Sequence, residues 1–273
     1  MQRLRTAFFA LLLCLPAAGA AEAHFGMVIP SESTVMDARR AEVTLHLKFW
    51  HPFLNEGMDL EKPASFIVRK GGADEDLLPT LKEGREQGRK VWSTTRRLDA
   101  PGLYTFVMEP KPYFEKEEDC WIVHYTKAYV DAFGDDEGWS SPVGLKTEIV
   151  PLTRPGALYA GNVFQGRVLL NGKPAPDTDV EIEWYPGKDK RGRAPYEGMI
   201  TQTVKTDENG VFTYAAPRAG WWGFAALSED GTRLPFAGEE KPVELGAVLW
   251  IWFHEFLNPE PLPRRAAQPG KQP

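Results

Sequence analysis

The chain has 273 residues and a formal net charge of −6, and 42% of its residues are hydrophobic. This length suits one large domain or two ordinary ones, with enough apolar residues for a substantial core. The acidic balance argues against nucleic acid and anionic membranes as partners, and it is compatible with the handling of cations.

The first 23 residues have the pattern of a secretory signal peptide. Two arginines lie in the opening five residues, residues 7–15 are apolar, and Ala21-Glu22-Ala23 is an A-x-A cleavage site. We therefore expect cleavage after Ala23, export to the periplasm and a mature chain that begins at His24. The apolar run is too short to span a bilayer, and no later segment approaches 18 uncharged apolar residues, so no direct membrane insertion of the mature chain is expected.

Short alternating segments separated by Gly, Pro and Asn turns predict an all-β protein without long helices. Residues 43–49 alternate cleanly, which places their apolar side chains on one face of a strand. Residues 24–150 are therefore predicted to form an N-terminal, metal-binding β-sandwich. Its further strands are predicted at residues 65–69, 90–95, 103–109 and 121–130.

A Pro- and Gly-containing segment at residues 151–156 marks a plausible module boundary. Residues 151–257 then predict a second β-sandwich, of the immunoglobulin or transthyretin kind, because turns recur about every ten residues. Its strands are predicted at residues 163–170, 180–185, 201–206, 211–214, 220–227 and 243–253. Residues 258–273 are rich in proline and charge, a composition typical of a disordered tail.

The two cysteines, Cys14 and Cys120, cannot support an internal disulfide in the mature chain. Cys14 lies in the predicted signal peptide and is lost on cleavage. A lone Cys120 leaves the exported protein to hold its fold by packing. This residue is a soft donor for a metal, although a buried structural cysteine is the commoner outcome.

The chain has five histidines, and three of them are candidate metal ligands. His46 falls on the face opposite the apolar residues of its strand and is interpreted as an exposed strand residue. His254 ends the last predicted strand and carries little weight. His51 lies where a strand gives way to a loop, held extended by the following proline. His124 shares a strand face with Cys120 and Ile122, and an inward histidine needs a hydrogen bond or a metal to offset its burial.

His24, His51 and His124 together predict a transition-metal site. Cleavage after Ala23 would free an α-amine on His24, which could close a chelate ring with its own Nδ1, since both groups lose protons easily near neutral pH. Four nitrogen ligands suit square-planar or tetragonal Cu(II) or Ni(II), and ligand chemistry alone favours copper. Glu56, Met58, Asp59 and Cys120 are candidates for an axial or supporting contact.

No hydrolytic or phosphate-binding motif stands out, so we expect a protein without catalytic residues. The sequence lacks G-x-S-x-G, and the segment that follows Gly144 is not a phosphate loop. The tryptophan-rich segments at residues 221–224 and 250–253 are interpreted as packing residues rather than a sugar platform.

The chain resembles the periplasmic components associated with nickel/cobalt uptake systems of the energy-coupling-factor ABC type, a family long catalogued as a domain of unknown function. The resemblance spans nearly the whole mature chain. Its motifs are His24-Phe-Gly-Met-Val-Ile-Pro30, Lys48-Phe-Trp-His51-Pro-Phe53, Met108-Glu-Pro-Lys-Pro-Tyr113, Glu118-Asp-Cys-Trp-Ile-Val-His124-Tyr-Thr-Lys127, Pro142-Val-Gly-Leu-Lys-Thr-Glu-Ile-Val-Pro151, Tyr159-Ala-Gly-Asn-Val-Phe-Gln-Gly166, Gly220-Trp-Trp-Gly-Phe224 and Glu244-Leu-Gly-Ala-Val-Leu-Trp250.

This resemblance implies a metal-binding module followed by one like carboxypeptidase regulatory domains. It also implies delivery of Ni(II), or Co(II), to the membrane subunits of a transporter, and it reverses the order of metals from copper first to nickel first. Three alternatives stay open: a periplasmic copper carrier, a copper oxygenase with an N-terminal histidine brace, and an adhesion or scaffold module without metal.

Overall fold

The computed structural model describes residues 24–259, which fold into three β-sheets joined by turns and short 3-10 helices. The all-β prediction is confirmed. The predicted signal peptide and all but the first two residues of the predicted tail lie outside the described residues. Within the described part of the chain, no helix has the length and apolar character needed to cross a membrane.

The first sheet has five strands in the order β1-β3-β8-β7, with β4 paired to β3. These strands are β1 (Phe25–Pro30), β3 (Glu42–His51), β4 (Glu56–Met58), β7 (Lys82–Glu86) and β8 (Arg89–Arg97).

The central sheet has eleven strands, of which eight follow the order β16-β15-β18-β20-β11-β9-β5-β6. The other three, β2, β10 and β19, pair with β11 or β20. The strands are β2 (Thr34–Val35), β5 (Ser65–Lys70), β6 (Ala73–Asp76), β9 (Gly102–Glu109), β10 (Tyr113–Glu115), β11 (Cys120–Ala132), β15 (Asp179–Tyr185), β16 (Gln202–Lys205), β18 (Gly220–Ser228), β19 (Arg233–Phe236) and β20 (Glu239–Phe253).

The third sheet has four strands, β12 (Thr147–Pro151), β13 (Val163–Leu170), β14 (Lys173–Pro174) and β17 (Val211–Ala215). The 3-10 helices are η1 (Ala38–Arg40), η2 (Leu78–Thr80), η3 (Pro155–Ala157) and η4 (Glu197–Met199).

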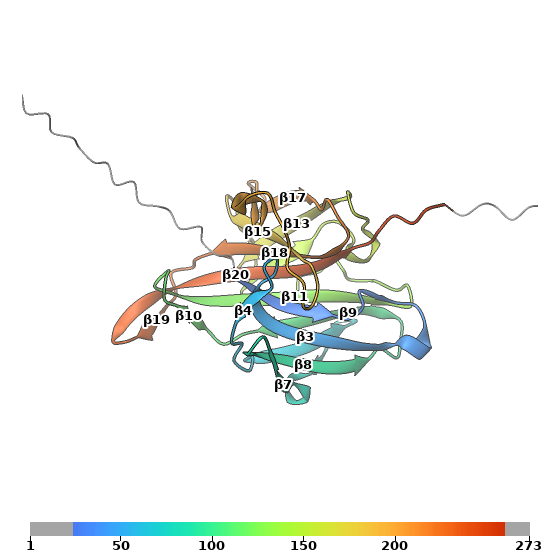
Figure 1. The fold of residues 1–273 in the computed structure, drawn as a ribbon, viewed down its shortest axis with the longest axis horizontal. Helices are drawn as coiled ribbons and strands as arrows, with labels where there is room; N and C mark the ends of the chain where they lie inside the picture. Colours follow the sequence, from blue (N-terminus) through green and yellow to red (C-terminus); the bar gives the residue numbers. More distant parts are fainter. Residues whose placement is uncertain (1–23, 260–273) are drawn as a thin grey trace, which may run out of the picture.

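The central sheet is covered on both faces, so the molecule has three layers. Figure 1 shows β20 and β11 between β3 and β8 on one side and β13 and β17 on the other. Residues Val248 and Trp250 of β20 join the core beneath the first sheet, whereas Leu249 and Ile251 join the core beneath the third. A strand buried on both faces needs a continuous apolar run, which explains the composition of residues 245–253.

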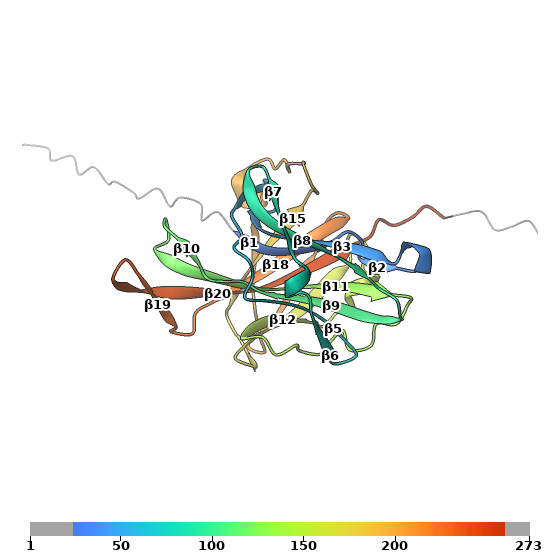
Figure 2. The same cartoon turned by 90° about the horizontal axis from the view of Figure 1, so that it is seen from below.

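Strands from both predicted modules belong to the central sheet. β11, from the first half of the chain, pairs in parallel with β20 at the end of the second, from Trp121 opposite Val243 to Ala128 opposite Trp250. The division into residues 24–150 and 151–257 stays a prediction, but the hydrogen-bonded sheet runs across it. At one end of the molecule, β10 and the β19–β20 arm project together (Figure 1 and Figure 2), and Phe114 stacks on Phe236 there.

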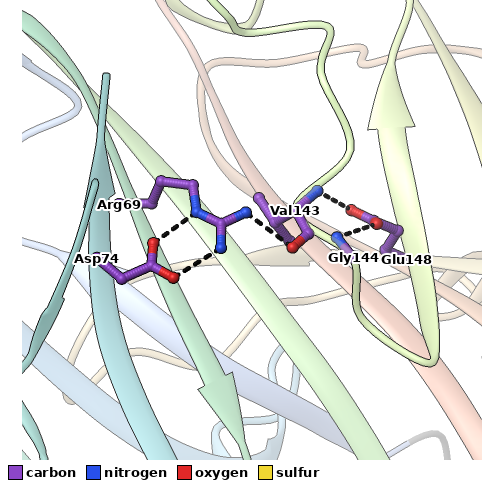
Figure 3. A network of polar contacts seen from close by, with 5 residues as sticks. All are labelled: Arg69, Asp74, Val143, Gly144 and Glu148. Atoms are coloured by element: carbon purple, nitrogen blue, oxygen red, sulfur yellow. Dashed lines mark hydrogen bonds and ion pairs between the residues drawn. The ribbon is translucent and has the colours of Figure 1, made fainter. Parts of the chain in front are cut away.

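A buried ion pair fastens the loop that joins β11 to β12, and we call it the Lys127–Glu148 clamp. Lys127 Nζ donates to Glu148 Oε2 at 2.6 Å, and the side chains are 1% and 2% exposed. Glu148 also accepts from the backbone N–H groups of Val143 and Gly144, and Arg69 donates to the Val143 carbonyl (Figure 3). Burial alone would raise the pKa of Glu148, but Lys127 and the two N–H groups outweigh it and lower that pKa. Every oxygen of this carboxylate therefore has a hydrogen-bond donor.

Candidate functional site

The pairing of β1 with β3 brings His24 beside His51. In this antiparallel register, Phe25 lies opposite Trp50. His24 precedes Phe25 and His51 follows Trp50, so both histidines lie at the same end of the strand pair. The imidazole centroids of His24 and His51 are 4.5 Å apart. Two of the three predicted ligands, separated by 27 positions in the chain, are thus neighbours.

His51 is buried at the end of β3, with 4% of its surface exposed, and it faces a carboxylate from the central sheet. Its Nδ1 lies 3.9 Å from Oε1 of Glu183, a residue of β15 with no exposed surface. The Glu183 carboxylate accepts from the Phe53 backbone N–H at 3.0 Å and from the Thr201 hydroxyl at 2.5 Å. These two hydrogen bonds therefore hold the Glu183 carboxylate in place beside His51.

His124 lies on β11 of the central sheet, beside β20, and 3% of its surface is exposed; β1 of the first sheet packs against β11. Its Nδ1 accepts a hydrogen bond from the Gly26 backbone N–H at 3.3 Å. A Cβ placed on Gly246, its partner on β20, would overlap the imidazole Cδ2 and lie 2.6 Å from Nε2. The ring therefore occupies space that only a glycine at position 246 leaves open.

The remaining nitrogen of His124 points toward a second carboxylate. Nε2 has no hydrogen-bond partner among the described residues and lies 3.7 Å from Oε1 of Glu244, which is also on β20. That separation is too long for a hydrogen bond. A buried polar atom in this state is uncommon and points to a ligand or water that completes it.

Phe49 lies near two of the histidines: the centroid of its ring is 5.6 Å from the ring centroids of both His24 and His124. Burial, reinforced by the charges that His51 and His124 could carry, lowers the pKa of His24 to about 3. The imidazole of His24 is therefore neutral throughout the physiological range, and neutral imidazole is the form that binds metals.

The three predicted ligands are gathered, but they are not in the geometry of a bound ion. Within residues 24–259, no group of three or more His, Cys, Asp or Glu side chains is arranged to hold a metal ion. The α-amine of the predicted chelate depends on cleavage at residues outside the described part. Loading an ion would thus require the side chains to move, and the metal site stays a prediction.

The predicted supporting residues differ in their surroundings. Glu56 is exposed and pairs with Arg191 at 3.0 Å. Met58 packs against the core beneath the first sheet. Asp59 accepts from the Lys90 backbone N–H at 2.6 Å. Their axial or supporting role stays a prediction.

Cys120 is a buried thiol next to carboxylates. Its Sγ lies 3.8 Å from Oε2 of Glu118. Burial, followed by the negative charges of Glu244 and Glu118, raises the pKa of Cys120 to about 12. The thiolate that metals and oxidants require is therefore disfavoured.

The sequence analysis missed the carboxylates that surround the histidines. Glu181 and Glu183 alternate on β15 and share a face, and Glu244 reaches the same layer from β20. Burial, then the charges of Glu244 and Glu183, raise the pKa of Glu181 to about 7. Alternation within residues 180–185 was a readable signal for the two β15 residues, but their proximity to β11 depends on strand pairings that the sequence does not display.

The other two histidines lie elsewhere. His46 is half-buried rather than exposed, five residues before His51 and so about 17 Å from it along β3. Burial lowers its pKa, and the charge of Lys48 adds to the effect. His254 is half-buried and forms an isolated bridge with Tyr159.

Residues 21–230 match the family described as "Domain of unknown function (DUF4198)", which covers more than half of the chain. The chain belongs to this family. No curated protein has a matching sequence.

Among solved structures, the chain is similar to the D0-D1 domain of Intimin, with 13% identity, coverage of 85% of this chain and 100% of that one, and a TM-score of 0.24. It is also similar to the Yersinia pseudotuberculosis adhesin InvE, with 10% identity, coverage of 84% and 61%, and a TM-score of 0.24. For BcpA, the major pilin subunit of Bacillus cereus, the identity is 11%, the coverage is 85% and 66%, and the TM-score is 0.20. Similarities at this level carry no argument about function.

Proposed function

We propose that this protein is a periplasmic metal-binding protein that captures Ni(II), with Co(II) as the second candidate, and delivers it to the membrane subunits of an ABC-type uptake transporter. The observation that carries the proposal is the convergence of His24, His51 and His124 from three distant segments, with the first two rings 4.5 Å apart. Imidazoles gathered from three segments are a costly arrangement for a purely structural core, because each buried ring nitrogen needs a partner.

The chemistry of the donors suits a borderline divalent ion. Imidazole nitrogens bind nickel, copper, cobalt and zinc, and the freed α-amine of His24 would add a fourth nitrogen. The neutral state of the His24 imidazole removes proton competition at that ligand. Nickel stands ahead of copper because of the family resemblance, not because of intrinsic affinity.

We assign this protein a role in metal transport rather than in catalysis, in which each protein molecule binds one ion and releases it. The predicted signal peptide supports an extracytoplasmic location. The net charge of −6 favours the approach of cations and disfavours nucleic acid.

A copper site is the second candidate, and the His24–His51 pair is the observation that favours it. An N-terminal histidine brace needs the amine and imidazole of the first residue and one further imidazole, and His51 is positioned to be that imidazole. If the brace activates oxygen, copper-loaded protein should cleave glycans when a reductant is supplied; a carrier should not.

The test is a competition titration of Ni(II) against a chromophoric chelator, with the chain processed to begin at His24. The wild-type protein should bind one ion. A triple variant with His24, His51 and His124 replaced by alanine should lose that binding while keeping its β-sheet circular dichroism. A His46→Ala variant is the matched control and should bind normally. Unchanged nickel affinity in the triple variant would overturn the proposal.

A further inference from the structure

Glu244 stands out because it faces the only ring nitrogen of His124 that the fold leaves available. The other nitrogen, Nδ1, accepts the Gly26 N–H. Nε2 is buried, has no hydrogen-bond partner within residues 24–259, and lies 3.7 Å from the Glu244 carboxylate. The contact joins a nitrogen and an oxygen that are both metal-binding atoms, on adjacent parallel strands of the central sheet.

The distance between these atoms fits a shared ion better than it fits a direct contact. Nitrogen and oxygen ligands lie about 2.1 Å from such an ion, so two of them are about 3.0 Å apart when adjacent in a square-planar site, about 3.4 Å apart in a tetrahedral site and about 4.2 Å apart when opposite. A hydrogen bond would draw the same two atoms to about 2.9 Å. The observed 3.7 Å lies within the range that a shared ion allows and beyond that of a hydrogen bond.

The surroundings of Glu244 are suited to a cation. Glu244 is partly exposed, with 25% of its side-chain surface accessible, which gives an ion a route from solvent. Its Oε1 faces the buried Nε2 of His124 at 3.7 Å, so an ion that entered here would meet a carboxylate oxygen and a ring nitrogen together.

We propose that the Glu244 carboxylate is a ligand of the captured ion, together with Nε2 of His124. This inference deepens the proposed function and rests on it, because it concerns the same ion. The ion would then have a mixed nitrogen–oxygen environment instead of nitrogens alone. Oxygen ligands shift a site away from soft Cu(I) and toward divalent ions such as Ni(II), Co(II) and Zn(II).

Binding through Nε2 has a consequence for β1. Because Nδ1 accepts the Gly26 N–H, the neutral imidazole carries its proton on Nε2 in the metal-free protein. The ion displaces that proton, which moves to Nδ1, and the ring can then no longer accept from Gly26. Capture of the ion should therefore release the Gly26 amide and loosen the start of β1, next to His24.

The experiment measures Ni(II) and Co(II) affinity of the chain that begins at His24, in the wild type and in Glu244→Gln, Glu244→Asp and Glu42→Gln variants. Glu42→Gln removes the same charge from an exposed position at the far end of β3 and is the matched control. We expect Glu244→Gln to weaken binding by at least about tenfold, Glu244→Asp to recover part of the loss, and Glu42→Gln to match the wild type. Co(II) absorption should also change in Glu244→Gln, because an oxygen ligand is lost.

Hydrogen exchange supplies the second readout. Nickel should speed exchange of the Gly26 amide in the wild type. Affinity and Co(II) spectrum unchanged in Glu244→Gln, with binding still abolished by His124→Ala, would overturn this inference and leave the proposed function standing. A wild-type protein that binds neither metal would overturn both. Circular dichroism of each variant checks that a loss of binding is not a loss of fold.

Discussion

The Lys127–Glu148 clamp and the histidine site each include an ionisable side chain buried on β11 of the central sheet, Lys127 and His124, yet the two sites satisfy their polar atoms differently. Each oxygen of Glu148 accepts a hydrogen bond from the backbone of the β11–β12 loop (Figure 3). Oε2 also accepts one from the Lys127 side chain. At the histidine site, Nε2 of His124 has no such partner within the described chain and faces Glu244 across 3.7 Å.

This contrast separates a structural network from a candidate functional one. A fully satisfied buried network specifies one arrangement of the chain, whereas an incomplete one leaves a polar atom available for a ligand. The clamp should therefore govern stability without affecting metal binding. The histidine site should govern metal binding, and its protonation should affect stability only at acidic pH.

The largest expected effect is a loss of stability caused by a substitution in the clamp. Lys127→Met should lower the free energy of unfolding by about 3–5 kcal/mol, because it leaves the Glu148 charge buried without its partner. Urea unfolding followed by tryptophan fluorescence measures the change. Lys205→Met, which removes an exposed lysine paired with Asp179, is the control and should have little effect. If nickel affinity fell along with stability in Lys127→Met, the proposed separation of the two regions would be wrong.

Next in size is a change at Gly246 that leaves every candidate ligand in place. Gly246→Ala puts a methyl group where the His124 ring lies, so the ring must move. We expect nickel affinity to fall by about tenfold, as for other changes that misorient a ligand. In the control, Gly84→Ala, the nearest atom to the new Cβ is a Val91 methyl group at 3.7 Å, and binding should be normal. Equal affinity in both variants would show that the position of His124 does not matter.

A pH titration sharpens the comparison further. Burial lowers the pKa of His24 from its ordinary 6.5 to about 3, so protonation favours the unfolded chain. The resulting stability is complete above pH 6.5 and is lost as the pH falls from there toward 3. The His24→Gln variant should show a flatter dependence of unfolding free energy on pH across that window. An NMR midpoint for the His24 ring near 6.5 in metal-free protein would contradict the burial of this site.

The smallest effect is expected at Cys120. Because its thiol pKa is raised to about 12, it is protonated at neutral pH and should not ligate the ion. Cys120→Ser should leave nickel affinity within about twofold of the wild type, a difference well below that of losing a ligand. A larger loss in the competition titration would restore Cys120 as a ligand candidate.

Much of the fold was readable from local patterns. Alternation of apolar residues predicted β3, and the strands β5, β8, β9, β11, β13, β15 and β18 fall within a few residues of the predicted ranges. Short strands such as β2 and β14 carry no periodicity to detect. The three-layer arrangement was also not predicted, because it depends on the parallel pairing of β11 with β20 between residues about 120 positions apart.

The candidate site was predicted only in part for the same reason. His24, His51 and His124 could be chosen from residue type and local context, since each lies near a strand end or on an apolar face. Glu244 gave no local sign of a role, because its position opposite His124 Nε2 arises from the register of two distant strands. Glu183 likewise reaches His51 only through the packing of the first sheet on the central one.

Native mass spectrometry of the protein exported and processed by a bacterial host, then exposed to limiting Ni(II), tests the central claim most directly. The account predicts a chain that starts at His24 and retains one nickel ion, and no retained nickel when His24, His51 and His124 are all replaced by alanine. A wild-type spectrum without metal, or a triple variant that retains nickel equally well, would contradict the account.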